Sequence, residues 1–478
     1  MESLANKMLK LFNTLTKKIE DFKPIKDKNV GIYTCGPTVY DFAHIGNFRA
    51  YISADVLKRY LVYRGYNVKH VMNITDVDDK TIKGSHKNKI SLREYTENYT
   101  KIFFEDIKTL NISTPDFFPR AAEHIPEMID IIKKLLNKGI AYKSSDNSVY
   151  FAISKFKDYG KLSHIQLENL KEGARVKHDE YSKDEAKDFC LWKAYDKDDN
   201  DVFWDTELGK GRPGWHIECS AMNMKYLGEE FDIHTGGVDL IFPHHENEIA
   251  QSCGATGKSF VHFWIHNEHL LVNGRKMSKS LGNFYTLRDL LDKNHNPRAI
   301  RYLLLSTHYR QQLNFTEDAL DGAQNTMQRF DDLVLKLKEI KELKELKKNS
   351  DENKRVSELI AESRKVFEKN MDNDLSISEA LAGIFEFTRE INIILNEDGL
   401  SKSDSEKVIG FLKEIDNVLG VMKFEDGKIE KDIEDLIAER DNARKSKDFK
   451  RADEIRAELL KKGIILEDTS HGTRWKKS

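Results

Sequence analysis

Apolar and polar residues near the start of the chain follow first a strand pattern and then a helical one. Residues 29–35 alternate and carry β-branched and aromatic side chains, and the Gly36-Pro37 dipeptide interrupts them. Apolar residues then recur at helical spacing from 54 to 62, and Gly65 ends that pattern. Residues 67–75 again have the composition of a strand. The pattern predicts strand, helix and strand in succession.

A helical crossover of this length joins two parallel strands in a right-handed unit. In sheets built from such units, ligands bind beyond the carboxyl ends of the strands. Cys35 and Thr75 each come at the end of a predicted strand. We therefore expect both residues at a ligand-binding edge.

The rest of the chain changes from a mixed pattern to a helical one. Residues 111–204 combine helix and strand signals with a highly charged run, and we interpret them as an insertion into the first domain. The α/β pattern resumes afterwards and extends to residues 276–280, beyond which helices dominate. One helix begins with a predicted capping box of Ser376 and Glu379, and its expected buried face comprises Leu381, Ile384, Phe385 and Ile391.

A charged helical hairpin is predicted at the C-terminal end, where Asp448 would cap the second helix and Gly463 would end it. Residues 440–478 contain 12 Lys/Arg and 7 Asp/Glu, a balance of +5, whereas the whole chain has 77 Lys/Arg and 80 Asp/Glu, a balance of −3. The overall charge therefore does not indicate nucleic-acid binding, but this segment is locally basic.

Length and composition narrow the class of protein. A chain of 478 residues has room for about three domains. Its 39% hydrophobic and 33% charged residues are typical of a soluble globular protein. The four scattered cysteines indicate a reducing compartment, and neither a signal peptide nor a membrane-spanning run is evident. We expect a cytoplasmic protein with no membrane partner.

The tetrapeptide His44-Ile45-Gly46-Asn47 lies between the first predicted strand and its helix. Free backbone N–H groups and the helix dipole favour an anion such as phosphate at that point. Taken alone, the tetrapeptide is also consistent with an ordinary loop.

The pentapeptide Lys276-Met277-Ser278-Lys279-Ser280 places two lysines and two hydroxyls in a short loop. This composition suits the stabilisation of charge on a migrating pyrophosphate. The alternative is a solvated basic loop without a specific role.

A third set of residues has the chemistry of a metal site. His244 and Glu248 lie four residues apart, so on a helix they project from one face. His245 has an apolar residue at the same offset, and we therefore favour His244 as a ligand. Cys35 and Cys219 add thiols from distant segments. Together these residue types suit zinc, although a free cysteine after a strand is more often a core residue.

The tetrapeptide and the pentapeptide together resemble the HIGH and KMSKS signatures of class I aminoacyl-tRNA synthetases, with Asn47 in place of the last histidine of HIGH. Asn47 keeps a hydrogen-bonding side chain near the phosphates. Across nearly the whole chain, seven segments resemble the cysteinyl-tRNA synthetase family: CGPTVYDFAHIGNFR, NITDVDDK, DFCLWK, GWHIECSAMN, GGVDLIFPHHENEIAQS, KMSKSLGN and RADEIRAELLKKGIILEDTSHGTRW. The substitution of asparagine at position 47 also occurs in that family.

The resemblance implies an α/β fold with a Rossmann-type parallel-sheet catalytic domain and an inserted α+β subdomain. An α-helical bundle and a small C-terminal anticodon-binding domain would follow. The expected domains are the catalytic halves 1–110 and 205–265, the insertion 111–204, a KMSKS-bearing stem-contact region 266–325, the bundle 326–425 and the anticodon-binding domain 426–478.

The resemblance also implies a set of ligands. One Zn²⁺ per chain would be held in the amino-acid pocket by Cys35, Cys219, His244 and Glu248. ATP, with Mg²⁺, would contact Lys279 and His44 and approach Gly236, Gly237 and Asp239.

The resemblance further implies catalytic and substrate-binding roles. Transition-state charge would be stabilised by His44, Asn47, Lys276 and Lys279. Gly36, Thr75 and Trp215 would line the amino-acid pocket, although Trp215 is equally consistent with a core residue and Asp239 with a turn residue.

The implied activity is the ATP-dependent conversion of L-cysteine to cysteinyl adenylate and its transfer to the 3′ end of tRNA(Cys), by a monomer. A hydrophobic pocket separates cysteine from serine by only about 1–3 kcal/mol, whereas zinc favours a thiolate. We therefore expect zinc to select the substrate and expect no editing domain. The basic C-terminal segment, with Trp475 as a stacking surface, would bind tRNA.

Two rival interpretations remain. A related ligase joins cysteine through an adenylate to a sugar amine in mycothiol synthesis, but such enzymes lack a segment like residues 433–475. The second rival is a zinc-containing RNA-binding protein without catalysis, and the intact HIGN and KMSKS segments argue against it.

Overall fold

A computed structural model describes residues 8–165, 175–176, 187–342, 353–397, 399–424, 431–469 and 472–477. The chain divides into two compact units, Met1–Lys423 and Phe424–Ser478.

The first unit contains a four-stranded parallel sheet in the order β11-β10-β3-β4. Its strands are β3 (Asn29–Thr34), β4 (Asn67–Met72), β10 (Phe231–Gly237) and β11 (Val261–Asn267). Helix α1 (Ile45–Tyr63) connects β3 to β4, and Gly65 follows it with φ +81°. The predicted strand, helix and parallel strand are therefore confirmed.

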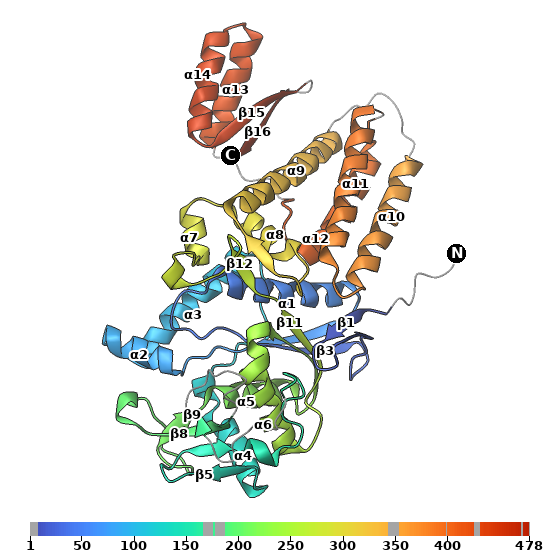
Figure 1. The fold of residues 1–478 in the computed structure, drawn as a ribbon. Helices are drawn as coiled ribbons and strands as arrows, with labels where there is room; N and C mark the ends of the chain where they lie inside the picture. Colours follow the sequence, from blue (N-terminus) through green and yellow to red (C-terminus); the bar gives the residue numbers. More distant parts are fainter. Residues whose placement is uncertain are drawn as a thin grey trace. The chain divides into compact units, whose positions relative to one another are not determined.

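Helices cover both faces of this sheet. Helix α1 lies across one face, and α5 (Trp215–Leu227) and α6 (Glu246–Thr256) lie on the opposite side (Figure 1). Buried aliphatic and aromatic residues fill the space between these layers, among them Ile32, Tyr33, Phe48, Ile52, Met222, Ile233 and Trp264. The two faces of the sheet are thus covered by helices, and the predicted ligand-binding edge lies at the carboxyl ends of its strands.

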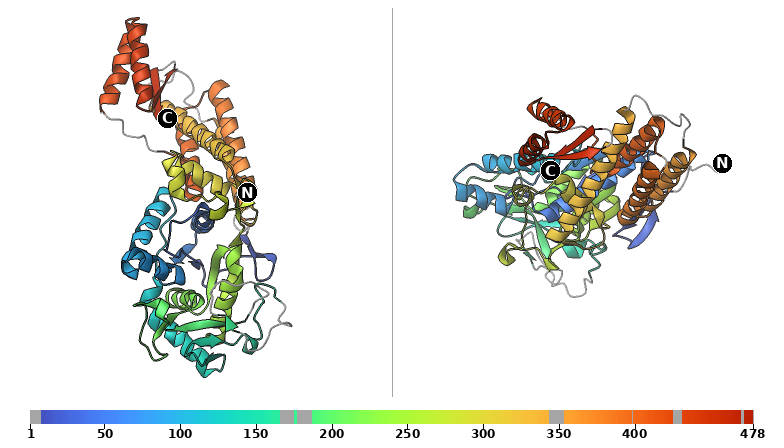
Figure 2. Two further views of the ribbon diagram at one scale, coloured as in Figure 1. Left: turned by 60° about the vertical axis from the view of Figure 1, so that its left-hand side comes forward. Right: turned by 90° about the horizontal axis from the view of Figure 1, so that it is seen from above.

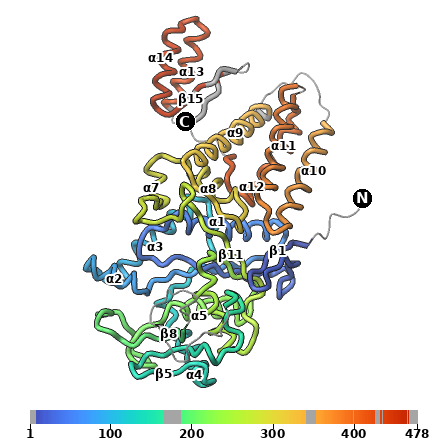
Figure 3. Tube along the Cα trace, in the orientation of Figure 1, coloured from blue at the N-terminus to red at the C-terminus, as the bar shows by residue number. Residues whose placement is uncertain are grey.

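The chain leaves the sheet after β4 and returns to it at β10, as Figure 3 traces. Between them lie the helices α2 (Asp79–Asn88), α3 (Leu92–Thr109), α4 (Ile125–Asn137) and α5. A second sheet belongs to the same region, with the strands β5 (Ala141–Lys143), β6 (Val149–Phe151), β7 (Arg175–Val176), β8 (Asp188–Ala194) and β9 (Gly211–Pro213). The chain therefore contains a mixed α and β insertion, whose boundaries remain a prediction.

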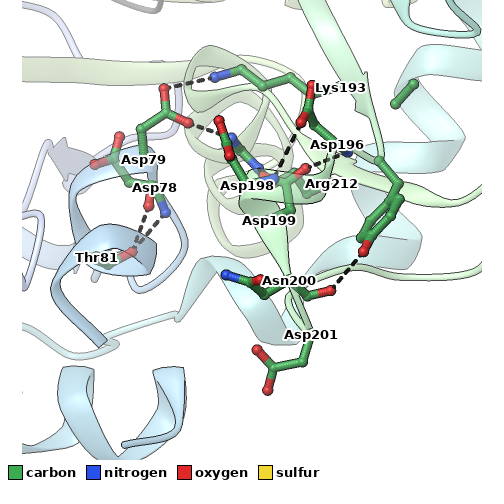
Figure 4. A network of polar contacts seen from close by, with 12 residues as sticks. Asp78, Asp79, Thr81, Lys193, Asp196, Asp198, Asp199, Asn200, Asp201 and Arg212 are labelled. Atoms are coloured by element: carbon green, nitrogen blue, oxygen red, sulfur yellow. Dashed lines mark hydrogen bonds and ion pairs between the residues drawn. The ribbon is translucent and has the colours of Figure 1, made fainter. Parts of the chain in front are cut away.

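A polar network joins the second sheet to the start of α2 (Figure 4). Arg212 of β9 pairs with Asp79 and with Asp199, the latter at 2.8 Å from Nε to Oδ1. Lys193 of β8 pairs with Asp79 at 3.2 Å. Asp78 caps α2 by accepting a hydrogen bond from the Lys80 backbone N–H at 2.7 Å. These contacts hold the first turn of α2 against the second sheet.

A hairpin and a small sheet complete the α/β part of the first unit. The hairpin pairs β1 (Lys10–Asn13) with β2 (Lys18–Asp21), and the small sheet has the order β13-β12-β14. Its strands are β12 (Leu270–Val272), β13 (Arg275–Lys276) and β14 (Leu313–Phe315), and the helices α7 (Leu287–Asp292) and α8 (Pro297–Ser306) lie between β13 and β14 in the sequence.

The first unit ends in the helices α9 (Glu317–Glu342), α10 (Lys354–Met371), α11 (Ile377–Glu397) and α12 (Lys402–Leu419). The face of α11 predicted to be buried does contain Leu381, Ile384 and Ile391. The prediction was wrong for Phe385, which is 38% exposed. Phe385 lies one residue beyond Ile384, so its ring turns about 100° away from the buried stripe and meets the rings of Tyr302 and Phe330 instead.

The second unit contains α13 (Lys431–Lys445), α14 (Phe449–Lys461), β15 (Ile464–Thr469) and β16 (Gly472–Lys477), all visible in Figure 2. Asp448 accepts a hydrogen bond from the Arg451 N–H at 3.1 Å, and Gly463 has φ +74° after the end of α14. Both predicted helix boundaries are therefore confirmed. The side chain of Trp475 lies outside the described residues.

Among the described residues, no helix combines the length and the apolar character needed to cross a membrane.

A buried arginine connects four distant parts of the first unit. Arg301 of α8 is fully buried and donates from Nη2 to Asp55 of α1 at 2.6 Å. Its other N–H groups donate to the carbonyl oxygens of Leu419, Leu110 and Asn111. The guanidinium thus fastens the end of α12 to the helix that covers the sheet.

We expect Arg301→Met to lower the free energy of unfolding by about 3–5 kcal/mol, because Asp55 would stay buried without its main partner. Urea denaturation measures this loss. The control is Arg389→Met, which removes an exposed pair with Glu386 and should leave the midpoint unchanged. An equal urea midpoint for the two variants would contradict the stabilising role of the Arg301–Asp55 pair.

Candidate functional site

Cys35 and Gly36 directly follow β3 at the carboxyl edge of the sheet. The Cys35 N–H donates to the Thr235 carbonyl of β10 at 3.3 Å. Gly36 donates its N–H to Asn73 Oδ1 at 2.9 Å, and a Cβ at this position would lie 1.8 Å from the Asn73 carbonyl oxygen. Only glycine therefore fits position 36. Thr75, also predicted for this pocket, is buried and accepts a hydrogen bond from the Asn73 side-chain amide at 3.1 Å.

The four predicted metal ligands meet in one buried cluster. The two thiol sulfurs, of Cys35 and Cys219, are 4.0 Å apart. Glu248 Oε1 lies 3.1 Å from His244 Nε2 and 3.9 Å from Cys35 Sγ. All four ligand atoms lie within 4.8 Å of one another. The residues come from the end of β3, from α5, and from both sides of the start of α6, so the fold unites segments more than 200 residues apart.

Protonation within this cluster is uneven. Burial raises the pKa of the Cys35 thiol well above its usual range, and its neighbour Cys219 raises it further. Burial also acts to raise the pKa of Cys219, but the hydrogen bond with Cys35 and the nearby His244 outweigh burial and lower it to about 6. The pKa of Glu248 is lowered to about 2 because His234 and His244 outweigh the effect of burial. Burial acts to lower the pKa of His244, but Cys219 and Glu248 outweigh burial and raise it to about 10. The cluster therefore favours a Cys219 thiolate, a Glu248 carboxylate and a His244 imidazolium that compensate one another.

Two histidines that the sequence pattern did not select also reach the cluster. His245 Nε2 lies 3.3 Å from Cys35 Sγ, and His234 Nε2 lies 3.1 Å from Glu248 Oε2. Cys35, His234, His245 and Glu248 accordingly form a second set that could hold a metal ion. His245 and Glu248 are three residues apart, a spacing that places two side chains on one helix face just as the spacing of four between His244 and Glu248 does. This spacing was the signal from which His245 could have been predicted as a ligand.

Trp215 and Gly236 border the same cluster. The Trp215 ring stacks on the His244 ring with centroids 4.1 Å apart. A Cβ on Gly236 would lie 2.6 Å from Cε1 of His245. Trp215 of the predicted amino-acid pocket therefore borders His244, and Gly236 of the predicted ATP site borders His245.

The HIGN segment forms the cap of α1. The Asn47 backbone N–H donates to His44 Nδ1 at 3.2 Å, and the His44 N–H donates to Asn47 Oδ1 at 3.1 Å. This reciprocal cap explains why asparagine works at position 47, since its amide oxygen is a good acceptor at that place. Two of the four predicted charge-stabilising residues thus shape the amino end of the helix.

The cap also fixes the chemistry of the His44 ring. Because Nδ1 accepts a hydrogen bond, the neutral ring carries its proton on Nε2. Burial lowers the pKa of His44 to about 4, and the positive charge of Lys279 contributes to the decrease while Asp239 opposes it. His44 is therefore a neutral N–H donor at physiological pH.

The KMSKS loop lies directly against the HIGN segment. The Ile45 N–H donates to the Tyr285 carbonyl at 3.0 Å, and the His44 and Phe284 rings are 5.3 Å apart. Lys279 lies 5.0 Å above the Phe284 ring and forms an ion pair with Asp41. Two motifs separated by about 230 residues are thus brought together.

Asn283 organises this loop, a role that the sequence pattern did not single out. Its Oδ1 accepts from the Ser278 N–H at 2.9 Å, and its amide donates to the Lys276 carbonyl at 3.1 Å. Lys276 itself is exposed on β13, where it pairs with Leu271 of β12. The structure therefore brings Lys279, but not the side chain of Lys276, into contact with the HIGN side of the site.

The remaining predicted ATP residues lie at the end of β10 and just after it. Asp239 is exposed, close enough to His44 to influence its pKa, and a Cβ on Gly237 would lie 2.3 Å from Asp239 Oδ1. This tight turn leaves the backbone of residues 236–237 without side chains at the end of the strand.

A parallel sheet that brings HIGN and KMSKS segments to one edge defines the fold of a class I aminoacyl-tRNA synthetase. Two solved structures share this fold. Methionyl-tRNA synthetase from Mycobacterium tuberculosis in complex with methionyl-adenylate has a TM-score of 0.61 at 16% identity, over 82% of this chain and 90% of that one. A putative arginyl tRNA synthetase from Campylobacter jejuni has a TM-score of 0.54 at 12% identity, over 84% and 95%.

Sequence comparison narrows the class to one family. Residues 21–325 match the family of tRNA synthetases class I (C) catalytic domains, 366–423 match a DALR domain, and 426–475 match the cysteinyl-tRNA ligase anticodon binding domain. The chain is 50% identical to a cysteine–tRNA ligase of Brachyspira hyodysenteriae, over 98% of both chains. It is 48% identical to one of Chlamydia muridarum, over 98% of this chain and 99% of that one. The chain belongs to the cysteine–tRNA ligase family.

The protonation of His44 can be tested through its effect on ATP use. We expect the ratio of kcat/KM for ATP between the natural protein and His44→Asn to stay constant from pH 5.5 to 8, because kcat/KM reports the free enzyme and His44 gains a proton only near pH 4. Pyrophosphate exchange measures both values. A ratio that falls as the pH decreases through 6.5 would contradict a neutral His44.

Proposed function

We propose that this chain activates L-cysteine with ATP, forming cysteinyl adenylate and pyrophosphate, and transfers the cysteine to the 3′ end of tRNA(Cys). One observation carries the proposal: the buried pair of thiols lies at the same sheet edge as the HIGN and KMSKS segments. Membership of the family supports the reaction, and the matched anticodon binding domain supports the RNA partner.

The cluster residues fit a zinc ion. Two cysteine sulfurs, one imidazole nitrogen and one carboxylate oxygen are donors that zinc prefers, and here they converge in a buried place where Cys35 keeps 8% of its surface exposed. The set with both thiols, Cys35, Cys219, His244 and Glu248, suits zinc better than the alternative set with one thiol. We therefore assign these four residues as the zinc ligands.

When bound, Zn²⁺ supplies a soft positive centre that favours a substrate thiolate over a hydroxyl and lowers the pKa of the thiol. The protein's own residues provide the rest of the selection. Gly36 lets the chain after Cys35 pack directly against the Asn73 backbone, and Trp215 closes the pocket over His244. Thr75 lies at the neighbouring strand end, where a small polar wall suits the amino and carboxylate groups of cysteine.

The HIGN and KMSKS segments would carry out the activation. His44 Nε2 and the Gly46 backbone N–H at the amino end of α1 bind the ATP phosphates, with Mg²⁺ entering as part of that substrate. The cysteine carboxylate attacks the α-phosphorus, and the bond to the bridging oxygen breaks to release pyrophosphate. Lys279, on an exposed loop, exchanges its pairing with Asp41 for the developing negative charge.

The ATP base would lie at the turn after β10. Gly236 and Gly237, the last two residues of β10, present backbone without side chains there, and the exposed Asp239 stands at the border. Asn47 acts by holding the cap of α1, and Lys276 contributes charge from the rim of the loop. We also propose that the protein acts as a monomer in the cytoplasm, which its free cysteines suit.

The experiment that tests this function measures cysteine-dependent ATP–pyrophosphate exchange and charging of tRNA(Cys) by the same preparation. Both activities are expected. Exchange without charging, but with ligation to a sugar amine, would favour the mycothiol-type ligase. Binding of tRNA without exchange would favour a protein that has lost catalysis.

The choice between the two ligand sets has its own test. We expect His244→Asn to lose most of its zinc and His245→Asn to retain about one zinc per chain, because only the first variant removes a donor from the set with two thiols. Atomic spectroscopy of the purified variants gives the zinc content, and circular dichroism confirms that both are folded. Loss of zinc from His245→Asn alone would overturn the assignment.

A further inference from the structure

Two exposed aromatic side chains stand beside the catalytic lysine. Tyr40 is 36% exposed and Phe42 is 40% exposed, in the loop between β3 and α1. They flank Asp41, the partner of Lys279. We call Tyr40 and Phe42 the aromatic ledge. Its rings do not act in the mechanism above, and large apolar side chains at the border of a site often mark a binding surface.

The ledge is held firmly from behind by α3. Phe42 meets Tyr99 edge to face with centroids 5.7 Å apart, and Tyr99 in turn meets Tyr95 at 5.2 Å. The Tyr95 hydroxyl donates to the Tyr40 carbonyl at 2.6 Å. The loop is thus anchored while both ledge rings stay exposed, which lowers the entropy cost of binding a ligand.

Two lysine side chains lie close to the aromatic ledge. Lys80 Nζ lies 5.5 Å from the centroid of the Tyr40 ring, and Lys279 follows on the side of Asp41. Lys80 belongs to the first turn of α2, which Asp79 fastens to Lys193 and Arg212 (Figure 4). Fixed aromatic rings next to lysines form the combination that binds unpaired nucleotides, through stacking and phosphate contact.

The topology distinguishes which nucleotide fits. The proposed site for the ATP base follows β10, on one side of β3, whereas the ledge contacts α2 and α3, which follow β4 on the other side. One ATP molecule with its phosphates at α1 would place its base on the β10 side. The aromatic ledge therefore remains available for a base of the other substrate, the tRNA.

We propose that Tyr40 and Phe42 stack with an unpaired base of the tRNA 3′ end, and that Lys80 contacts the adjoining phosphate. This inference rests on the proposed function, because it assumes that tRNA delivers its 3′ end to this edge of the sheet. The aromatic ledge would act in the transfer of cysteine to tRNA, the step that follows adenylate formation.

The test compares exchange with charging in a Tyr40→Leu, Phe42→Leu double variant. We expect ATP–pyrophosphate exchange within about twofold of the natural protein. We expect kcat/KM for tRNA charging to fall about 5- to 150-fold, the range for loss of one stacked base. Tyr40→Phe keeps the ring and should charge tRNA normally. A base analogue, 2-aminopurine in the unpaired 3′ end, should show quenched fluorescence on the natural protein and less quenching on the double variant.

The matched control is Phe117→Leu. Phe117 is 41% exposed and has Lys69 Nζ 5.1 Å from its ring centroid, but it lies beside β4, away from Lys279. This variant should change neither reaction. Normal charging and normal quenching in the double variant would overturn the inference and leave the proposed function intact. Equal losses of exchange and charging would place the ledge in the ATP site and also overturn it. Absence of cysteine-dependent exchange in the natural protein would instead refute the proposed function.

Discussion

The structure depends on enclosing Glu248 and two thiols at the edge of the sheet. A buried carboxylate is costly unless charged or hydrogen-bonding partners compensate it. Glu248 obtains them from His234, His244 and Asn223, and Cys219 faces both Cys35 and His244. The strands, α5 and α6 must therefore keep their positions relative to one another, because a small displacement would leave charged groups buried without partners. A cation in the middle of this cluster would satisfy the same groups together, which links the stability of the site to the ion that we assign to it.

The second constraint is the contact between HIGN and KMSKS. Arg49, one turn beyond the α1 cap, is buried and donates to the carbonyl oxygens of Glu268, His269 and His308. These carbonyls border the small sheet that bears the KMSKS loop, so the guanidinium holds that sheet on α1. The loop itself stays exposed and is anchored by Asn283 and Asp41. This exposed position suits the role that we propose for Lys279, which would release Asp41 to stabilise the charge on the leaving pyrophosphate.

Much of this arrangement could be predicted from the sequence, because the decisive signals were local. The first strand, helix and strand, the cap at Asp448 and the end at Gly463 follow from periodicity and capping chemistry. The meeting of Cys35 with Cys219 followed from family resemblance, since no local pattern links residues so far apart. The proximity of His234 and His245 was not predicted. A histidine within a strand has no distinctive signature, and the offset of three from His245 to Glu248, which also fits one helix face, was passed over in favour of the offset of four. Phe385 shows the same limit: its partners Tyr302 and Phe330 come from other helices.

The measurement that tests the central claim most directly is the ratio of kcat/KM for cysteine to that for serine in ATP–pyrophosphate exchange. A hydrophobic pocket that discriminates by shape alone reaches about 10- to 200-fold for a pair of such similar size. Recognition of a thiolate by the cluster predicts a ratio well above 1,000, which collapses when zinc is removed by a chelator and returns when zinc is restored. A cysteine-to-serine ratio of only about 10 to 200, or a ratio that is unaffected by zinc removal, would contradict the selection of the substrate by zinc.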